Sequence, residues 1–225
     1  MALAQEIIGE STASARIEVA YDVPTREAEA QLVYSLGQGE NSGFETLVRS
    51  YGPLVMAVAR RYLRSEADAA DCFQETFIAV FESIGQYEQR SSLRHWVRGI
   101  AINKCLMCLR KRETQREQSI EHLLPLYDER GHRLEVTSPA HRSGIEELLD
   151  KEHLHRVVRE TIDELPDRYR LVLLLRDIDG YSTRETASIL GIKENTAKTR
   201  LHRSRMALKS LLKPVLGKLE AHVDV

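Results

Sequence analysis

The sequence predicts an all-α fold in which two small helical domains are joined by a flexible linker. Apolar residues recur at intervals of three and four along most of the chain, which is the period of an amphipathic helix. No stretch of the sequence shows the sustained alternation of apolar and polar residues that is typical of a β-strand. Between the two helical parts, residues 115–150 hold two prolines, two glycines and an excess of acidic residues, which indicates a linker.

The first helices follow an N-terminal extension. Residues 1–28 are small and polar with little periodicity, so we expect a loosely ordered segment there. From Gln31 the pattern becomes helical, and Pro53 stands where the first turn of a helix accepts proline. We expect the next helix to end at Gly85. Its apolar stripe comprises Phe73, Phe77, Ile78, Val80, Phe81 and Ile84.

A loop over residues 86–92 precedes the last helix of the first domain. Ser91 or Ser92 is expected to cap that helix, because a serine hydroxyl accepts a hydrogen bond from a first-turn amide. The apolar stripe of the helix comprises Leu93, Trp96, Val97, Ile100, Ala101, Leu106 and Leu109. Together these elements predict a first domain over residues 29–114.

The second domain is expected over residues 151–215, followed by a tail at 216–225. Its helical pattern starts near Glu147, breaks at Pro166 and resumes through Leu174. The remainder, up to Leu212, has the order helix, tight turn, helix.

The spacing in this last segment is that of a helix-turn-helix. Ser182 or Thr183 caps the first helix, and Glu185 stands at the right distance for a capping box. Ala187 is small where the two helices must approach closely, and Gly191 supplies a turn in which positive φ costs little only for glycine. The apolar face comprises Ile189, Leu190, Ile192, Ala197 and Leu201.

Overall composition is that of a globular chain, with 29% charged and 42% hydrophobic residues. This balance excludes a collagen, a mostly disordered chain and a disulfide miniprotein. No run approaches the roughly 18 apolar residues of a membrane span, and the first residues lack the pattern of a secretory signal. Three cysteines at low density favour a reducing compartment. We therefore expect a cytoplasmic protein that is not inserted in a membrane.

The net charge of −2 hides a segregation of charge along the chain. Residues 65–85 hold five acidic residues and no lysine or arginine, and residues 117–152 hold nine acidic and four basic ones. Residues 90–116 hold eight basic residues against one acidic, and residues 193–213 hold seven against one. Two basic surfaces are therefore separated by two acidic ones.

The second helix of the helix-turn-helix has a polar and basic face that suits the major groove of DNA. Polar residues at its N-terminus are expected to reach base edges, and the later basic residues to contact phosphates. This face comprises Glu194, Asn195, Thr196, Lys198, Thr199, Arg200, Arg203 and Arg205. His202 lies in the same helix, but a single histidine without a partner does not indicate a metal site.

Three runs, together with the helix-turn-helix, resemble in order the motifs of the extracytoplasmic-function (ECF) group of bacterial RNA polymerase sigma factors. The runs are DAADCFQETF from Asp68, SSLRHWVRGIAINKCLMCLRKR from Ser91 and LPDRYRLVLLL from Leu165. The resemblance covers about residues 31–212. It implies a region 2 domain, a region 4 domain, no cofactor, and three partners: core RNA polymerase, promoter DNA and an anti-sigma factor. Ala197 departs from the family, which more often has a larger aliphatic residue there.

In this family the acidic helix docks on the clamp helices of the largest polymerase subunit, and region 4 on the flap of the second-largest subunit. The resemblance therefore implies a polymerase contact set of Asp68, Asp71, Gln74 and Glu75. Acidic residues without any basic residue over this stretch are what a positively charged partner requires.

The family places the loop at 86–92 and the start of the next helix on the minus-10 promoter element, where a non-template base is flipped into a pocket. The implied contact set comprises Tyr87, Gln89, Arg90, Ser91, Ser92, Arg94, His95, Arg98, Asn103 and Lys104. Trp96 is of a type that stacks on bases, but its place on the apolar stripe favours the core.

Two other classes of protein fit the sequence less well. A polymerase-independent DNA-binding regulator explains the helix-turn-helix, but not the acidic helix or the second basic surface. An enzyme is disfavoured, because the sequence holds no phosphate loop, paired catalytic carboxylates or Ser/His/Asp arrangement. Cys105 and Cys108 form a C-x-x-C that could sense a metal or redox state, but a structural role is favoured because no second cysteine pair follows.

Overall fold

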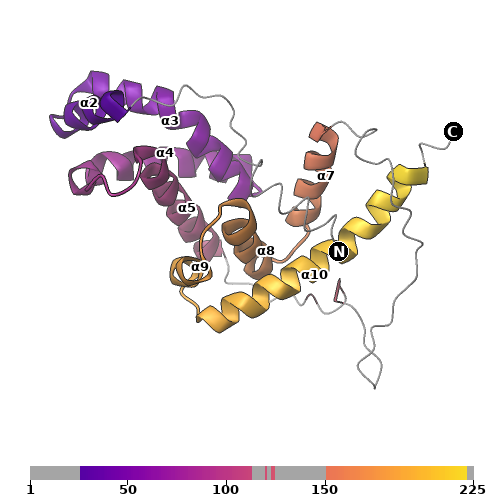
Figure 1. Ribbon diagram of the computed structural model, residues 1–225. Coiled ribbons are helices and arrows are strands. Elements are labelled where there is room, and N and C mark those ends of the chain that lie inside the picture. The colour runs from indigo at the N-terminus through magenta and orange to yellow at the C-terminus, as the bar shows by residue number, and fades with distance from the viewer. Residues whose placement is uncertain (1–25, 113–119, 121–122, 125–150, 222–225) are drawn as a thin grey trace. The chain divides into compact units, whose positions relative to one another are not determined.

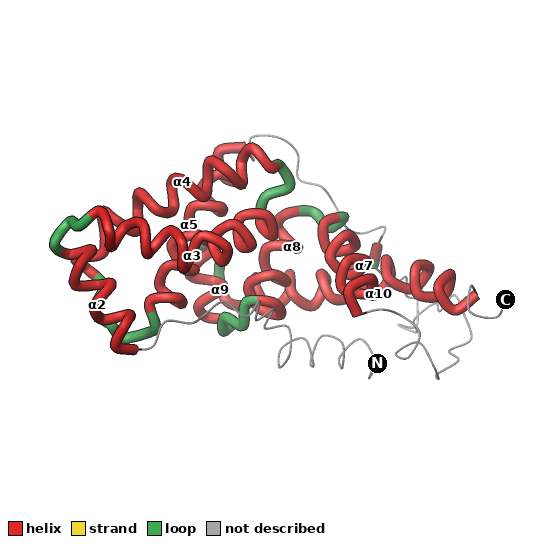
Figure 2. The backbone as a smooth tube through the Cα atoms, turned by 90° about the horizontal axis from the view of Figure 1, so that it is seen from above, coloured by secondary structure: helices red, strands yellow, loops and turns green. Residues whose placement is uncertain are grey.

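The computed structural model describes residues 26–112, 120, 123–124 and 151–221 (Figure 1). Every regular element in those ranges is helical, so the predicted all-α fold is confirmed there (Figure 2). The described residues fall into two units that divide at the start of the expected linker: residues 26–112 form the first, and residues 120, 123–124 and 151–221 belong to the second. Ile120, inside the expected linker, is buried. The extension at 1–25 and most of the linker at 115–150 lie outside the described residues. None of the described helices is long and apolar enough to cross a bilayer.

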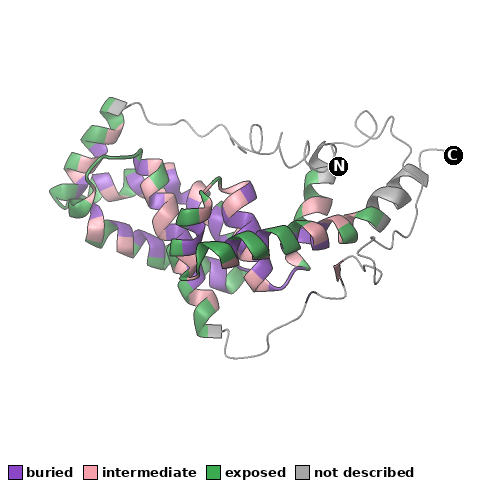
Figure 3. Ribbon diagram, turned by 60° about the horizontal axis from the view of Figure 1, so that its bottom comes forward, coloured by how far each residue is buried: buried purple, intermediate pink, exposed green. Residues whose placement is uncertain are grey.

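Within residues 26–112, the first unit is built from four α-helices and one 3-10 turn. They are α2 (Arg26–Gly37), α3 (Asn41–Tyr62), α4 (Glu66–Ser83), η1 (Ile84–Gln86) and α5 (Leu93–Arg112). Helices α3, α4 and α5 each pack against the other two, and α2 packs on α3 and η1. Buried residues, purple in Figure 3, lie along the sides on which these helices meet. The first helix begins at Arg26, so residues 26–28 belong to it and not to the extension.

Two sequence expectations for this unit were wrong in detail. Pro53 does not begin a helix: α3 runs through it without a break. A proline inside a helix costs about 3 kcal/mol, and the burial of its neighbours Tyr51, Gly52 and Val55 offsets that cost. The helix α4 ends at Ser83, and Gly85 lies inside η1.

The second unit is built around one long helix. Its elements are α7 (Lys151–Asp163), α8 (Asp167–Leu173), the π-helical turn η3 (Leu174–Ile178), α9 (Thr183–Leu190) and α10 (Glu194–Ala221). Helices α7, α8 and α9 all pack against α10. As expected, the chain breaks at Pro166, which is the N-cap of α8. Helix α10 continues past Leu212 to Ala221, so residues 216–221 extend this helix and are not a separate tail.

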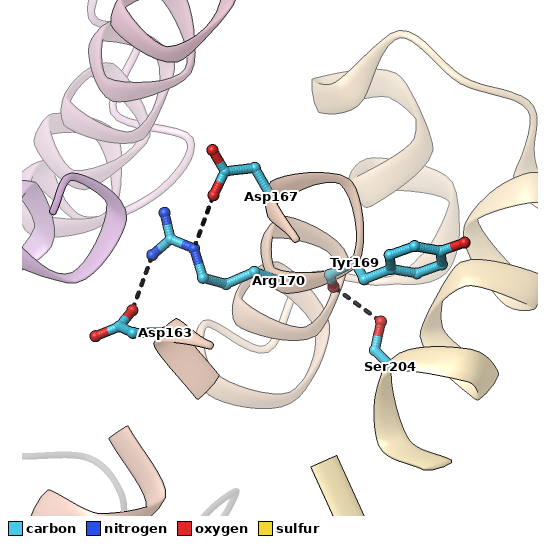
Figure 4. A network of polar contacts seen from close by, with 5 residues as sticks. All are labelled: Asp163, Asp167, Tyr169, Arg170 and Ser204. Carbon is cyan, nitrogen blue, oxygen red and sulfur yellow. Dashed lines mark hydrogen bonds and ion pairs between the residues drawn. The ribbon is translucent and has the colours of Figure 1, made fainter. Parts of the chain in front are cut away.

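A buried arginine holds the α7–α8 junction (Figure 4). The side chain of Arg170 is 1% exposed, and it donates to Asp163 at 3.1 Å and to Asp167 at 3.2 Å. The neighbouring carbonyl of Tyr169 accepts a hydrogen bond from the hydroxyl of Ser204 on α10 at 2.9 Å. One turn of α8 therefore anchors both α7 and α10.

Candidate protein and nucleic-acid interfaces

Helix α4 presents an acidic and apolar face. Ser65 caps it by accepting a hydrogen bond from the Asp68 amide at 3.4 Å, and Asp68 itself is only 8% exposed. Asp71, Gln74 and Glu75 are exposed. Of the four residues expected to contact a protein partner, the structure thus brings three to the surface and buries Asp68 at the helix start.

The exposed surface continues into two members of the apolar stripe expected along this helix. Ile78 is 56% exposed and Phe81 is 46% exposed, so the stripe is not buried along its whole width. Phe77 and Val80 fill the core instead, and Phe81 packs edge-on against Phe44 with ring centroids 5.6 Å apart.

The signal for this exposure was present in the spacing. Ile78 follows Asp71 by two helical turns and Glu75 by three residues, so it lies on the acidic side of α4. Exposed apolar residues beside charged ones indicate a protein-contact surface. We call Asp71, Gln74, Glu75, Ile78 and Phe81 the α4 face.

The loop between η1 and α5 has a defined conformation. The hydroxyl of Tyr87 donates to the carbonyl of Ser91 at 2.6 Å, and the Tyr87 ring lies 5.1 Å from that of Trp96. Gln89 adopts φ of 55°, a left-handed conformation that is uncommon outside glycine. The hydroxyl of Ser92, rather than that of Ser91, caps α5 by accepting from the His95 amide at 3.3 Å. These contacts fix the backbone of the loop that carries the polar side chains.

Most residues of the expected minus-10 set are accessible on this loop and helix. Tyr87, Arg94, Arg98 and Lys104 are half-buried, and the exposed members are Gln89, Arg90, Ser91, Ser92, His95 and Asn103. Arg90 forms an exposed ion pair with Glu88 at 2.5 Å. Trp96 is half-buried, so the expectation of a core residue holds only in part.

Lys104 lies on a different side of α5 from His95. It follows His95 by nine residues, which turns it by about half a turn around α5. Its charge acts on the Cys72 thiol of α4, where it helps the hydrogen bond from Cys105 to lower the Cys72 pKa. Lys104 thus lies on the opposite side of α5 from His95.

The helix-turn-helix has the predicted local geometry. The hydroxyl of Ser182 accepts from the Glu185 amide at 3.2 Å, and the Glu185 carboxylate accepts from the Ser182 amide at 2.7 Å. Gly191 ends α9 with φ of 67°, and the Ile192 amide donates to the Ala187 carbonyl at 3.0 Å. Ser182 is therefore the N-cap of α9, and the capping box and glycine turn are confirmed.

Helix α10 presents the expected polar face. Glu194, Asn195, Lys198, Thr199 and Arg203 are exposed, and Thr196 and Arg200 are half-buried. On the opposite side, Ala197 and Leu201 are buried. Ile189, Leu190 and Ile192 are half-buried rather than buried.

Arg205 differs from the other members of this set. Its guanidinium donates two hydrogen bonds to the buried carboxylate of Asp177 on η3, at 2.6 and 2.8 Å. These hydrogen bonds raise the pKa of Arg205 and fix the charge against η3. The side chain ties α10 to the rest of its unit, so it is not available as an unpaired phosphate contact.

The free cysteines that contact each other are not the two of the C-x-x-C motif. The sulfurs of Cys72 and Cys105 lie 3.2 Å apart between α4 and α5, and both residues are buried. The hydrogen bond to Cys72 and burial raise the pKa of Cys105. Cys108 is half-buried, and no group of metal-ligating side chains occurs within the ranges that the structure describes. The nearest partner of Cys105 is thus on another helix, a fact that spacing alone does not encode.

Both units match known sequence families. The family model described as Sigma-70 region 2 matches residues 47–115, and the one described as Sigma-70, region 4 matches residues 155–208. Together these matches cover more than half of the chain.

Curated relatives extend the similarity over nearly the whole chain. The RNA polymerase sigma-H factor of Pseudomonas aeruginosa is 27% identical, over 85% of this chain and 97% of that protein. The ECF RNA polymerase sigma-E factor of Haemophilus influenzae is 29% identical, over 82% of this chain and 95% of that protein. A solved structure of the sigma factor RpoE with the anti-sigma factor NepR, from Bartonella quintana, aligns with a TM-score of 0.48 and 24% identity, covering 76% and 96% of the two chains.

Proposed function

The chain belongs to the ECF group of the sigma-70 family, and on this premise we propose that it binds bacterial core RNA polymerase and directs it to specific promoters. The single observation that supports this most strongly is that one chain carries two kinds of surface. The α4 face is acidic and apolar, as suits a protein partner, and α10 carries a polar and basic helix-turn-helix face, as suits DNA. A protein that only bound DNA would need the second surface alone.

We assign residues 29–114 to region 2 and residues 151–215 to region 4, with the acidic linker between them. The α4 face is the contact for the clamp helices of the largest polymerase subunit. Because Asp68 is buried, its role is to support the start of α4 rather than to contact polymerase. Region 4 meets the flap of the second-largest subunit.

The loop at 86–92 and the first turns of α5 contact the minus-10 element. Their exposed amide, hydroxyl and arginine side chains are suited to the edge of an unstacked base and to nearby phosphates. The rings of Tyr87 and Trp96 contact each other and join the loop to the first turn of α5. Lys104 lies about half a turn around α5 from His95, so we leave it out of this contact set.

The start of α10 reads the minus-35 element in the major groove. Glu194, Asn195 and Thr196 lie in its first turn, where base edges come within reach, and Lys198, Arg200 and Arg203 follow toward the phosphates. Arg205 is excluded from this set because Asp177 holds it.

The protein catalyses no reaction of its own in this proposal; it supplies specificity to polymerase in the cytoplasm. An anti-sigma factor would hold the activity back by covering the α4 face. That partner needs a basic and apolar surface to match Asp71, Glu75 and Phe81.

Run-off transcription tests the proposal. Purified core polymerase is incubated with and without the protein on a pool of upstream regions from its host. Transcripts that appear only with the protein are expected, and their start sites define both promoter elements. Absence of transcripts, combined with tight sequence-specific DNA binding by the protein alone, would replace the proposal with a polymerase-independent regulator.

The minus-35 contacts give a first quantitative prediction. We expect Lys198→Ala and Arg203→Ala each to reduce the dependence of holoenzyme–promoter affinity on salt, lowering the slope of log affinity against log salt by about one. A phosphate contact contributes through counterion release and not through base identity. Fluorescence anisotropy of a labelled promoter over a range of salt concentrations measures this slope.

Lys209→Ala is the matched control, because this half-buried lysine lies further along the same helix. Its slope should equal that of the wild type. An unchanged slope in both Lys198→Ala and Arg203→Ala would contradict the assignment of these residues to the DNA phosphates.

A further inference from the structure

Glu29 on α2 joins the start of α5 to the core of the first unit. One carboxylate oxygen, Oε1, accepts a hydrogen bond from the Leu93 amide at 3.2 Å and from the Tyr51 hydroxyl at 3.3 Å. Leu93 is the first residue of α5 and Tyr51 lies in α3. Glu29 lies upstream of the residues that the region 2 family model matches, which begin at 47.

The Leu93 contact satisfies a backbone group that the helix cannot satisfy itself. The first amides of an α-helix have no partner within the helix. Leu93 is fully buried, so its amide depends on Glu29, while the Ser92 hydroxyl serves the His95 amide of the same turn. A carboxylate at this end is also stabilised by the helix dipole. The amides of Leu93 and His95, in the first turn of α5, thus each have a side-chain acceptor.

Tyr51 donates a hydrogen bond to the same carboxylate oxygen of Glu29. The phenol is buried, and burial together with the negative charge of Glu29 raises the Tyr51 pKa, so the hydroxyl stays protonated and donates. Burial raises the pKa of Tyr87, and the negative charge of Glu29 adds to this effect. Arg94, in the first turn of α5, acts electrostatically on Tyr51.

We propose that Glu29 is a positioning residue for minus-10 recognition, which fixes the start of α5 and thereby the orientation of the loop at 86–92. This inference rests on the proposed function, since it concerns how that loop reads promoter DNA. The residues at the loop–helix junction would bind the same bases less selectively if the first turn of α5 were free to fray.

Hydrogen exchange of the full-length protein, read by mass spectrometry, tests the contact without any promoter. In Glu29→Ala we expect peptides spanning residues 87–96 to exchange about five- to tenfold faster, the effect of losing a helix-terminal acceptor. Peptides from α4 should be unchanged. Glu29→Gln keeps an acceptor oxygen and should recover most of the protection, and Glu27→Ala, at an exposed position of the same helix, should match the wild type.

Transcription with core polymerase tests the functional consequence on a promoter mapped by run-off. Selectivity is the ratio of transcript from that promoter to transcript from versions with one substituted base. In Glu29→Ala we expect minus-10 selectivity to fall about fivefold, with minus-35 selectivity unchanged and with Glu29→Gln restoring it. If Glu29→Ala only destabilised the fold, the minus-10 and minus-35 selectivities would both fall or both stay unchanged.

The possible outcomes separate cleanly. Unchanged exchange at 87–96 overturns the contact, and faster exchange with unchanged minus-10 selectivity overturns the positioning role. If Glu29→Ala does not fold, Tyr51→Phe is used instead; it removes only the second donor and should show the same pattern more weakly. A wild-type protein that supports no transcription overturns the proposed function, and this inference with it.

Discussion

Arg170→Ala is expected to destabilise the second unit by about 2–5 kcal/mol, a large part of the stability of a small domain. The arginine is 1% exposed and pairs with Asp163 and Asp167, so truncation removes both ion pairs and leaves a cavity where α7 meets α8. The same turn anchors α10 through Tyr169 and Ser204. Loss of Arg170 therefore disturbs the support of the DNA-reading helix as well as the stability of its unit.

Urea denaturation followed by two probes measures this effect. The single tryptophan, Trp96, lies in the first unit, so its fluorescence reports on that unit alone, whereas circular dichroism reports on both. We expect Arg170→Ala to shift the dichroism transition of the second unit and to leave the fluorescence transition in place.

Two control variants locate the cause. Arg159→Ala, at an exposed position of α7, should change stability by no more than about 0.5 kcal/mol. Arg170→Met keeps most of the buried volume, and because Asp163 and Asp167 are 43% and 32% exposed, their carboxylates remain solvated. It should cost clearly less than alanine. Equal losses for methionine and alanine would show that the ion pairs, and not the packing, dominate.

The helix-turn-helix was predicted almost residue by residue because its rules are local. The Ser182 cap, its Glu185 partner and the left-handed Gly191 depend on neighbours within a few positions. The exposed polar face of α10 followed from helical period and residue type, and its contact with DNA stays a prediction. Secondary structure and this polar face were accessible from sequence for the same reason.

The contacts that the sequence did not reveal join residues that are distant in the chain. Arg205, which was expected to contact DNA, pairs with Asp177, 28 positions away. Leu93 depends on Glu29 across 64 positions. No periodicity or propensity encodes which charged side chains meet across such separations. Pro53 was misjudged for a related reason, since tertiary burial and not local preference keeps α3 intact around it.

Exposure on α4 was ambiguous for a geometric reason. A helix that packs on two neighbours buries a wide arc of its surface. The apolar side of α4 is wider than that arc, and it comprises Phe77, Ile78, Val80 and Phe81. Apolar residues at the edge of such a stripe face either the core or a partner. The packing of α3 and α5 against α4 decides between the two.

Reversing the charge of the α4 face is expected to abolish promoter-specific transcription. In the double variant Asp71→Lys with Glu75→Lys, two exposed acidic residues become basic opposite a partner that the proposal takes to be positively charged. Like charges brought together at an interface cost several kcal/mol, and each 1.4 kcal/mol is a factor of about ten in affinity. We expect run-off transcripts to fall at least about a hundredfold, with a parallel loss of co-elution with core polymerase in gel filtration.

A matched reversal elsewhere separates this effect from net charge. Glu27→Lys with Glu45→Lys changes the net charge by the same amount at exposed positions of α2 and α3, and it should transcribe within about twofold of the wild type. Both pairs should unfold at the same urea concentration as the wild type, because surface substitutions alter stability little. If the α4 variant bound core polymerase normally, the α4 face would not be the docking surface.

The pattern of loss also identifies which step fails. If the α4 face serves only to dock polymerase, raising the polymerase concentration should restore transcription from the reversed variant, with unchanged start sites and unchanged minus-10 selectivity. A damaged loop at 86–92 would behave differently, because saturating polymerase cannot restore base selectivity. Since α4 leads into that loop through η1, this comparison distinguishes a loss of affinity at the α4 face from a displacement of the promoter-reading residues behind it.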